Sequence, residues 1–185
     1  MPLDTKFEIN TNNDSYVLYF GRLSQEKGVS TLIEAAKISG CQLIIVGTGP
    51  QEEELKKLAN ACSNIKFTGF KTGEALQNYI KNSKCVVLSS EWYENGPYSA
   101  MEAMALGKPL IVSKNGGLPE LVEHEINGYI YDKTSDSLAE FINKMLQLPE
   151  ESYILMCNNS LNRAKNMFSA EKYVKELEKY YNALL

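Results

Sequence analysis

Short apolar runs alternate along the chain with stretches in which apolar residues recur every three or four positions. The recurring spacing predicts helices between the short runs, and further helices from residue 135 to 184. The short runs predict six strands, which are Tyr16–Phe20, Leu43–Val46, Ile65–Phe70, Cys85–Leu88, Leu110–Val112 and Gly128–Tyr131.

Strands that alternate with helices form βα units, and such units assemble into a parallel sheet with helices on both faces. Parallel strands are buried on both sides, which explains why each run is almost wholly apolar. We therefore expect an α/β fold, a Rossmann-like doubly wound parallel sheet with carboxyl-terminal helices. Residues 1–14 are polar and lack apolar periodicity, so we expect a linker or lead-in before a domain spanning residues 15–185.

Composition excludes several classes of protein. The chain has 185 residues, enough for one well-buried α/β domain, and its net charge of −4 argues against a nucleic-acid surface. No apolar run reaches the ~18 residues of a membrane span, and no signal-peptide pattern opens the chain. The four cysteines are scattered, which favours small buried residues in a reducing compartment over a metal site or disulfides. We expect a cytoplasmic protein.

The stretch from Glu94 to Pro109 carries the most unusual chemistry. After a predicted buried strand, a loop with two glutamates leads to Gly96-Pro97, which we expect to open a helix with Pro97 at its first position. That helix is almost wholly apolar except for Glu102. A carboxylate among apolar neighbours is costly unless it has a partner. We favour a ligand for Glu102 over a capping or solvent-grazing role.

In open α/β sheets the ligand lies beyond the carboxyl ends of the strands. Arg22 and Lys27 are the cations of the early strand-end loops, and together they could pair with a diphosphate, the alternative being ordinary surface cations. Glycines in these loops allow close backbone approach. The loop positions that we assign to the site for this reason are Gly21, Gly47, Gly96 and Pro97.

Five motifs along the chain resemble those of one known family. Glu94 and Glu102 are separated by seven residues and followed by Ala-Met-Ala-x-Gly-x-Pro. This resembles the signature of retaining GT-B glycosyltransferases of the group 1 type (family 4). The other motifs are Gly21-Arg22-Leu23-Ser24-x-Glu26-Lys27-Gly28, Gly47-Thr48-Gly49-Pro50, Phe67-x-Gly69-Phe70 and Gly116-Gly117-x-Pro119-Glu120.

The resemblance implies roles for individual residues. Arg22 and Lys27 would bind the phosphates of a nucleotide diphosphate sugar, and Glu94 would face its sugar. Glu102 would hydrogen-bond the ribose hydroxyls. Backbone N–H groups around Tyr98 and Ser99 would meet the phosphates, and the backbone near Phe70 and Lys71 would flank the base. The family generally needs neither a metal nor another cofactor, and the chain has no Asp-x-Asp pair.

The resemblance covers residues 16–132 and only the donor-binding half of such an enzyme. The amino-terminal half would hold a glycan or lipid-linked acceptor, could place the protein at the inner face of a membrane, and would be needed for transfer, so this half alone should be inactive. Alternatives are a non-catalytic nucleotide-sugar binding module and a nucleotide-sugar epimerase. NAD binding is weakly supported, because Gly47-Thr48-Gly49 lacks the third glycine of that fingerprint.

Overall fold

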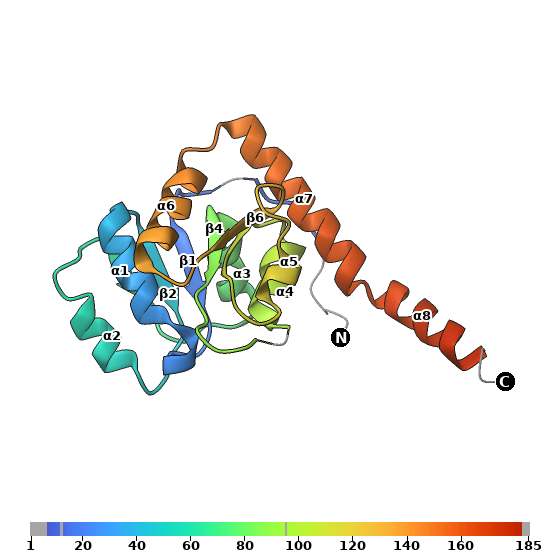
Figure 1. Cartoon of the computed structure of the whole chain (residues 1–185), viewed down its shortest axis with the longest axis horizontal. Helices are drawn as coiled ribbons and strands as arrows, with labels where there is room; N and C mark the ends of the chain where they lie inside the picture. The colour runs from blue at the N-terminus through green and yellow to red at the C-terminus, as the bar shows by residue number, and fades with distance from the viewer. Residues whose placement is uncertain (1–6, 12, 95, 183–185) are drawn as a thin grey trace.

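The computed structural model describes residues 7–11, 13–94 and 96–182. They contain a six-stranded parallel sheet with the order β3-β2-β1-β4-β5-β6, which confirms the predicted Rossmann-like, doubly wound fold (Figure 1). The strands are β1 (Val17–Phe20), β2 (Leu43–Val46), β3 (Ile65–Phe67), β4 (Cys85–Leu88), β5 (Leu110–Ser113) and β6 (Gly128–Tyr131).

Helices cover both faces of this sheet (Figure 1). One face carries α1 (Val29–Ser39), α2 (Glu52–Leu58) and α6 (Ser135–Leu146), and the other carries α3 (Gly73–Asn82), α4 (Tyr98–Ala105) and α5 (Leu118–Leu121). The long helix α7 (Glu150–Phe168) packs against both cores, and α8 (Ala170–Asn182) follows it. A short 3-10 turn, η1 (Gln25–Lys27), precedes α1.

The central strand β1 shows why the apolar runs are continuous. Val17 and Tyr19 enter the core beneath α1 and α6, whereas Leu18 and Phe20 enter the core beneath α3 and α4. Successive side chains of a strand point to opposite faces, so a strand covered on both sides must be apolar at every position.

Some predicted boundaries were wrong. The strand predicted over residues 65–70 ends at Phe67, because Gly69 takes a left-handed conformation (φ +71°) and turns the chain out of the sheet. Pro97 is the N-cap of α4, with an extended ψ of 128°, so the helix begins one residue later, at Tyr98.

The described part of the polar lead-in packs against the domain. Phe7 contacts the core beneath α4, and the Glu8 N–H donates to the Ala105 carbonyl at 2.9 Å. The Asp14 N–H donates to the carbonyl of Asn82 at 2.7 Å. Residues 1–6 and 12 lie outside the described part, so the assignment of residues 1–14 as a linker stays a prediction.

The strand order reverses between β1 and β4. These two strands pair in parallel, Val17 with Cys85 and Leu18 with Val86. The chain leaves β1 toward α1 on one face and leaves β4 toward α4 on the other, so the two loops diverge at the carboxyl edge. A doubly wound sheet binds its ligand at such a switch point.

None of the helices in the described ranges is both long and apolar enough to cross a membrane.

Candidate functional site

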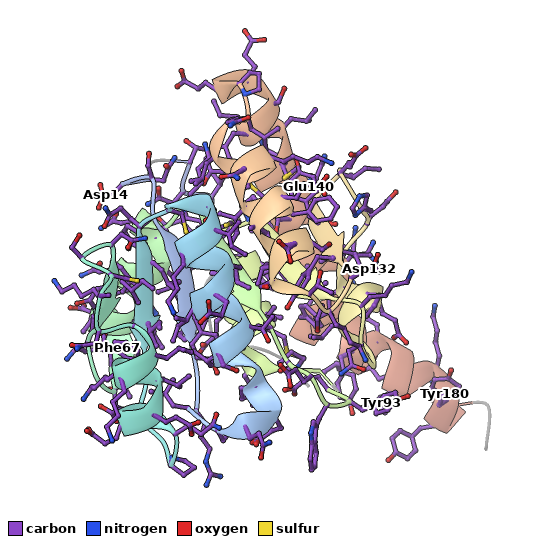
Figure 2. The ribbon with its side chains drawn as sticks, turned by 60° about the vertical axis from the view of Figure 1, so that its left-hand side comes forward. Asp14, Phe67, Tyr93, Asp132, Glu140 and Tyr180 are labelled. Carbon is purple, nitrogen blue, oxygen red and sulfur yellow. The ribbon has the colours of Figure 1, made fainter. Side chains whose placement is uncertain are left out.

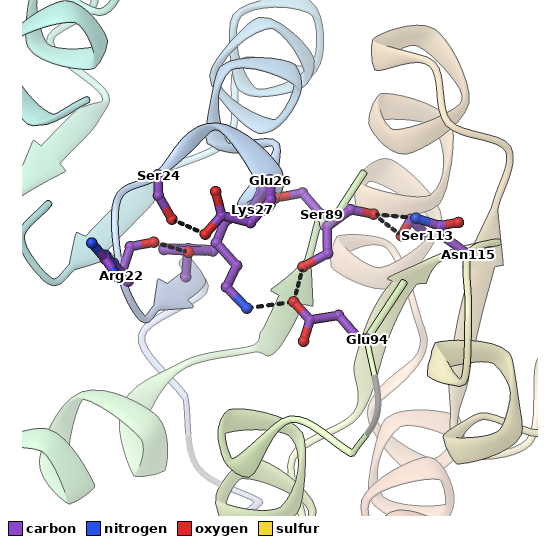
Figure 3. Close-up of polar contacts among 10 residues, drawn as sticks. Arg22, Ser24, Glu26, Lys27, Ser89, Glu94, Ser113 and Asn115 are labelled. Carbon is purple, nitrogen blue, oxygen red and sulfur yellow. Dashed lines mark hydrogen bonds and ion pairs between the residues drawn. The ribbon is translucent and has the colours of Figure 1, made fainter. Parts of the chain in front are cut away.

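The loops after β1 and β4 meet through one ion pair at the switch point. The Lys27 ammonium contacts the Glu94 carboxylate, and the two side chains are 29% and 16% exposed (Figure 3). The Ser90 hydroxyl donates to the same Glu94 oxygen, Oε1, at 2.7 Å. Lys27 is therefore not an ordinary surface cation, which was the alternative left open by the sequence, and Glu94 accepts from two donors.

The backbone of the β1 loop is fixed against the β4 loop. Gly28 has a φ of +60°, and a Cβ there would lie 2.2 Å from the Ser89 carbonyl oxygen, so this contact requires glycine. The Ser89 hydroxyl donates to the Lys27 carbonyl at 2.8 Å, and the Glu91 N–H donates to the Glu26 carbonyl at 2.9 Å. These bonds hold Lys27 and Glu94 within reach of each other.

The loop after β5 supports the β4 loop from its other side. A Cβ on Gly116 would lie 2.9 Å from the Tyr93 Cα, and the φ of Gly116 is +53°. The Gly117 N–H donates to the Glu94 carbonyl at 3.0 Å, and the Ser113 hydroxyl donates to the Ser90 carbonyl at 2.6 Å. The Glu94 loop is thus anchored on both flanks. These supporting serines were not among the predicted site residues.

The first turn of α4 follows this loop directly. Pro97 caps it without a side-chain hydrogen bond, and Tyr98 and Ser99 are its first helical residues. The first N–H groups of a helix lack acceptors within the helix and carry partial positive charge. Tyr98 is 53% exposed and Gly96 is also exposed, while Asn95 between Glu94 and Gly96 lies outside the described residues. The arrangement can receive an anion.

A cavity of about 400 Å³ joins the loops after β1, β2 and β3. Gly47, a predicted site residue, lies behind this cavity: it is buried, and its N–H donates to the Gly69 carbonyl at 2.9 Å. Lys71 is half-buried and lines neither this cavity nor the one beside α4. The residues that line the cavity are Gly21, Arg22, Thr48, Gly49, Pro50 and Phe70.

Glu102 lies apart from the Lys27–Glu94 pair. It borders a small cavity of about 100 Å³ between α3 and α4, together with Gly73, Gln77 and Leu106. The side chain is half-buried, and this burial raises the pKa of its carboxyl group. Its carboxylate has no hydrogen bond to another described residue. The geometry leaves room beside the carboxylate for a hydroxyl-bearing ligand, and the assignment of Glu102 as a ligand-binding residue stays a prediction.

Of the predicted site residues, the structure brings Lys27 together with Glu94, and Gly21 together with Arg22 and Phe70. Glu102 forms a third position, next to the start of α3. Within residues 7–11, 13–94 and 96–182, no three His, Cys, Asp or Glu side chains are grouped in a way that could hold a metal ion. The polar groups that remain are suited to phosphates and hydroxyls.

Comparison with known proteins gives the family. The model of the family described as glycosyl transferases group 1 matches residues 4–182. The chain is 33% identical over 179 residues to an uncharacterized glycosyltransferase of Methanocaldococcus jannaschii, a match that covers 92% of this chain and 45% of that protein. It is 29% identical over 195 residues to the lipopolysaccharide 1,2-N-acetylglucosaminetransferase of Salmonella typhimurium, covering 95% and 51%.

A solved structure agrees with the sequence matches. HepE of Anabaena, determined in complex with UDP, superposes with a TM-score of 0.81 at 26% identity, covering 92% of this chain and 49% of that one. The chain thus spans about half the length of the proteins that it resembles.

Proposed function

The chain belongs to the group 1 glycosyl transferases, and on that premise we propose that it is the donor-binding domain of a retaining glycosyltransferase. The whole enzyme transfers a hexose from a nucleotide diphosphate sugar to a glycan or a lipid-linked acceptor. An amino-terminal domain outside this chain holds that acceptor, and the donor half is inactive without it. The observation that the chain spans about half of each relative supports this division.

The observation that carries the proposal is the Lys27–Glu94 pair at the switch point between β1 and β4. A diphosphate brings more negative charge to Lys27 than one carboxylate does, so it can take over the ammonium. Glu94 is then free to accept hydrogen bonds from the hydroxyls of the donor sugar, while Ser90 keeps its carboxylate in place. The donor therefore changes the partner of Lys27 and replaces the ammonium at Glu94 with hydroxyl donors.

Arg22 supplies the second cation. Its side chain is exposed and lines the cavity beside β1, where a guanidinium can bind phosphate oxygens with two parallel hydrogen bonds. The N–H groups of Tyr98 and Ser99, reached past Gly96 and Pro97, approach the phosphates from the other side. Fixed positive groups around a departing diphosphate stabilise its charge in the transition state, and this stabilisation usually dominates such catalysis.

The nucleoside occupies the side of the site near α3. Phe70 is 69% exposed at the rim of the cavity of about 400 Å³, where its ring and the Lys71 backbone flank the base. Glu102 accepts the ribose hydroxyls, which fits a half-buried carboxylate that has no hydrogen bond to another described residue. HepE, a structural neighbour of this chain, was solved with UDP, and this supports a nucleoside diphosphate as the ligand.

The proposal is tested by calorimetric titration of the chain with UDP, GDP, uridine and UDP-glucose. We expect one nucleoside diphosphate to bind at a single site and its nucleoside to bind far more weakly, because Arg22 and Lys27 hold the phosphates. A chelator should leave this affinity unchanged, since no metal takes part. Equal affinity for uridine and UDP, with neither GDP nor UDP preferred, would contradict the proposal. Formation of a glycosidic bond with release of nucleotide, once the rest of the polypeptide is present, separates a transferase from a binding module or an epimerase.

A further inference from the structure

Two aromatic residues next to Glu94 have no role in the donor site described above. Trp92 is 68% exposed and Tyr93 is 89% exposed, so the described residues leave most of both rings in contact with water. Figure 2 shows Tyr93 at the loop end of the domain, far from Asp14 at the opposite end. Exposed apolar patches mark interaction sites more often than single exposed apolar residues do, and these two exposed residues are neighbours in the sequence.

The backbone that carries these rings is fixed. On one flank, the Glu91 N–H donates to the Glu26 carbonyl, and the Thr31 hydroxyl donates to the Glu91 carboxylate at 2.8 Å. On the other flank, the Tyr93 Cα lies so close to Gly116 that a Cβ there would come within 2.9 Å of it. Little backbone entropy is then lost when a ligand contacts the rings, and aromatic side chains have few rotatable bonds.

The position of the pair decides which ligand it suits. Lys27 and Arg22 lie in the β1 loop. In the proposed function the diphosphate binds these two cations and the donor sugar extends from it toward Glu94. Tyr93 directly precedes Glu94 in the same loop, and its Cα lies beside Gly116 in the loop after β5. Since Glu94 is the residue assigned to the donor sugar, a group that touches Trp92 and Tyr93 would lie next to that sugar. The neighbouring carboxylates of Glu91 and Glu94 are hydrogen-bond acceptors for hydroxyl groups.

We propose that Trp92 and Tyr93 form a stacking surface for a pyranose ring of the acceptor, a role that rests on the proposed function. The C–H face of a pyranose is apolar and packs on an aromatic ring, while its equatorial hydroxyls reach the carboxylates at the edge. A protein partner fits less well, because Glu91 is exposed beside the rings and would have to be desolvated. Recognition of the acceptor is then shared between this domain and the rest of the enzyme.

The sequence offers a direct probe, since Trp92 is the only tryptophan of the chain. Its fluorescence is followed while the chain is titrated with methyl glycosides of glucose, galactose, mannose and N-acetylglucosamine, with glycerol as the control polyol. We expect at least one glycoside to shift the emission in a saturable way, and glycerol to have no such effect. Tyr93→Leu, which keeps an apolar side chain but removes the flat ring, should weaken that glycoside roughly threefold to tenfold.

Tyr180→Leu is the matched control, because Tyr180 is also a highly exposed tyrosine (73%) but lies on α8 (Figure 2). It should not change the response. A chain that binds UDP but whose Trp92 emission ignores every glycoside, or responds equally in Tyr93→Leu, overturns the stacking surface and leaves the proposed function standing. Trp92 shielded from acrylamide in the ligand-free protein also overturns it, because protein then covers the ring. Failure to bind any nucleoside diphosphate would overturn both proposals.

Discussion

Both edges of the sheet carry lysines of low exposure, but the surroundings of these lysines differ. At the carboxyl edge, Lys27 is ion-paired with Glu94 and remains 29% exposed. At the amino edge, Lys84 and Lys108 precede β4 and β5 and are only 8% and 0% exposed. Burial lowers the pKa of Lys108 to about 8, so its charge is held at a cost in solvation.

Helix α7 closes the amino edge. The Tyr153 hydroxyl donates to the Lys84 carbonyl at 2.9 Å, and the Tyr153 ring lies under the Lys84 ammonium, 3.7 Å from nitrogen to ring centroid. The Ser160 hydroxyl donates to the Lys108 carbonyl at 2.8 Å. A buried lysine therefore does not by itself indicate a ligand site. In the proposed function, what distinguishes the carboxyl edge is that its charges change partners without disturbing the core.

The largest effect should come from the amino edge. Tyr153→Ala removes a buried ring and the hydrogen bond to Lys84, so it should lower the free energy of unfolding by about 3–5 kcal/mol. Affinity of the folded protein for UDP should not change, because Tyr153 contacts the amino edge of the sheet and lines neither cavity of the candidate site. Denaturant unfolding and calorimetry measure the two quantities. Tyr153→Phe, which loses only the hydroxyl, should cost about 1–3 kcal/mol. A loss of UDP affinity in the folded form of either variant would contradict the distinction between a structural amino edge and a ligand-binding carboxyl edge.

Arg22→Ala should show the opposite behaviour at the carboxyl edge. Its side chain is exposed, so thermal stability should hardly change. The lost charge-assisted hydrogen bonds should weaken UDP about tenfold or more, at ~1.4 kcal/mol per decade. Lys57→Ala removes another exposed cation, on α2, and serves as the control for net charge. Equal changes in UDP affinity in the two variants would show that Arg22 is an ordinary surface cation without a role in binding.

Glu102→Gln should weaken UDP binding and raise thermal stability, each by a smaller amount than the changes expected for Tyr153→Ala and Arg22→Ala. Burial raises the carboxyl pKa of Glu102 in the folded state, so the native protein binds more protons than the unfolded chain between the unfolded and folded pKa values. Stability falls as the pH rises through that window and stays lowered above it. The uncharged glutamine removes this loss, so the variant should melt higher at neutral pH.

The same substitution should change the pH dependence of binding. In the proposed function ribose hydroxyls hydrogen-bond the ionised carboxylate, so wild-type affinity for UDP should fall as the pH falls through the raised pKa. The glutamine variant should bind UDP more weakly at neutral pH and lack that slope. Calorimetric titration over a pH series measures the UDP affinity and its pH dependence. If the variant keeps the wild-type pH dependence, a group other than Glu102 is responsible for it.

The fold could be predicted because burial on both faces forces each strand to be apolar at every position, as in Val17–Phe20. The candidate loops followed from the same reasoning, since parallel strands bring their carboxyl ends to one edge. The contacts within the edge could not be predicted. Whether Lys27 is solvated or paired depends on Glu94, 67 residues away, and on where Gly28 allows two backbones to meet.

Local geometry limited the predictions elsewhere. Proline is compatible with both the N-cap and the first helical position, so the sequence could not distinguish them at Pro97. Gly69 fits an extended strand as readily as the left-handed turn that ends β3. Trp92 and Tyr93 gave no signal, because nothing in their spacing shows whether an aromatic side chain faces the core or water.

The central claim is that a nucleoside diphosphate takes Lys27 over from Glu94, and calorimetric titration of UDP into Lys27→Met and Glu94→Gln tests it most directly. Both variants break the same ion pair, so any loss of stability should be similar in the two. Their affinities should nevertheless diverge: Lys27→Met should bind UDP about tenfold or more weakly, whereas Glu94→Gln, which leaves the ammonium free for phosphate, should bind it at least as tightly as the wild type. Equal UDP affinity in both variants and the wild type would show that the pair is structural and that the diphosphate does not bind there.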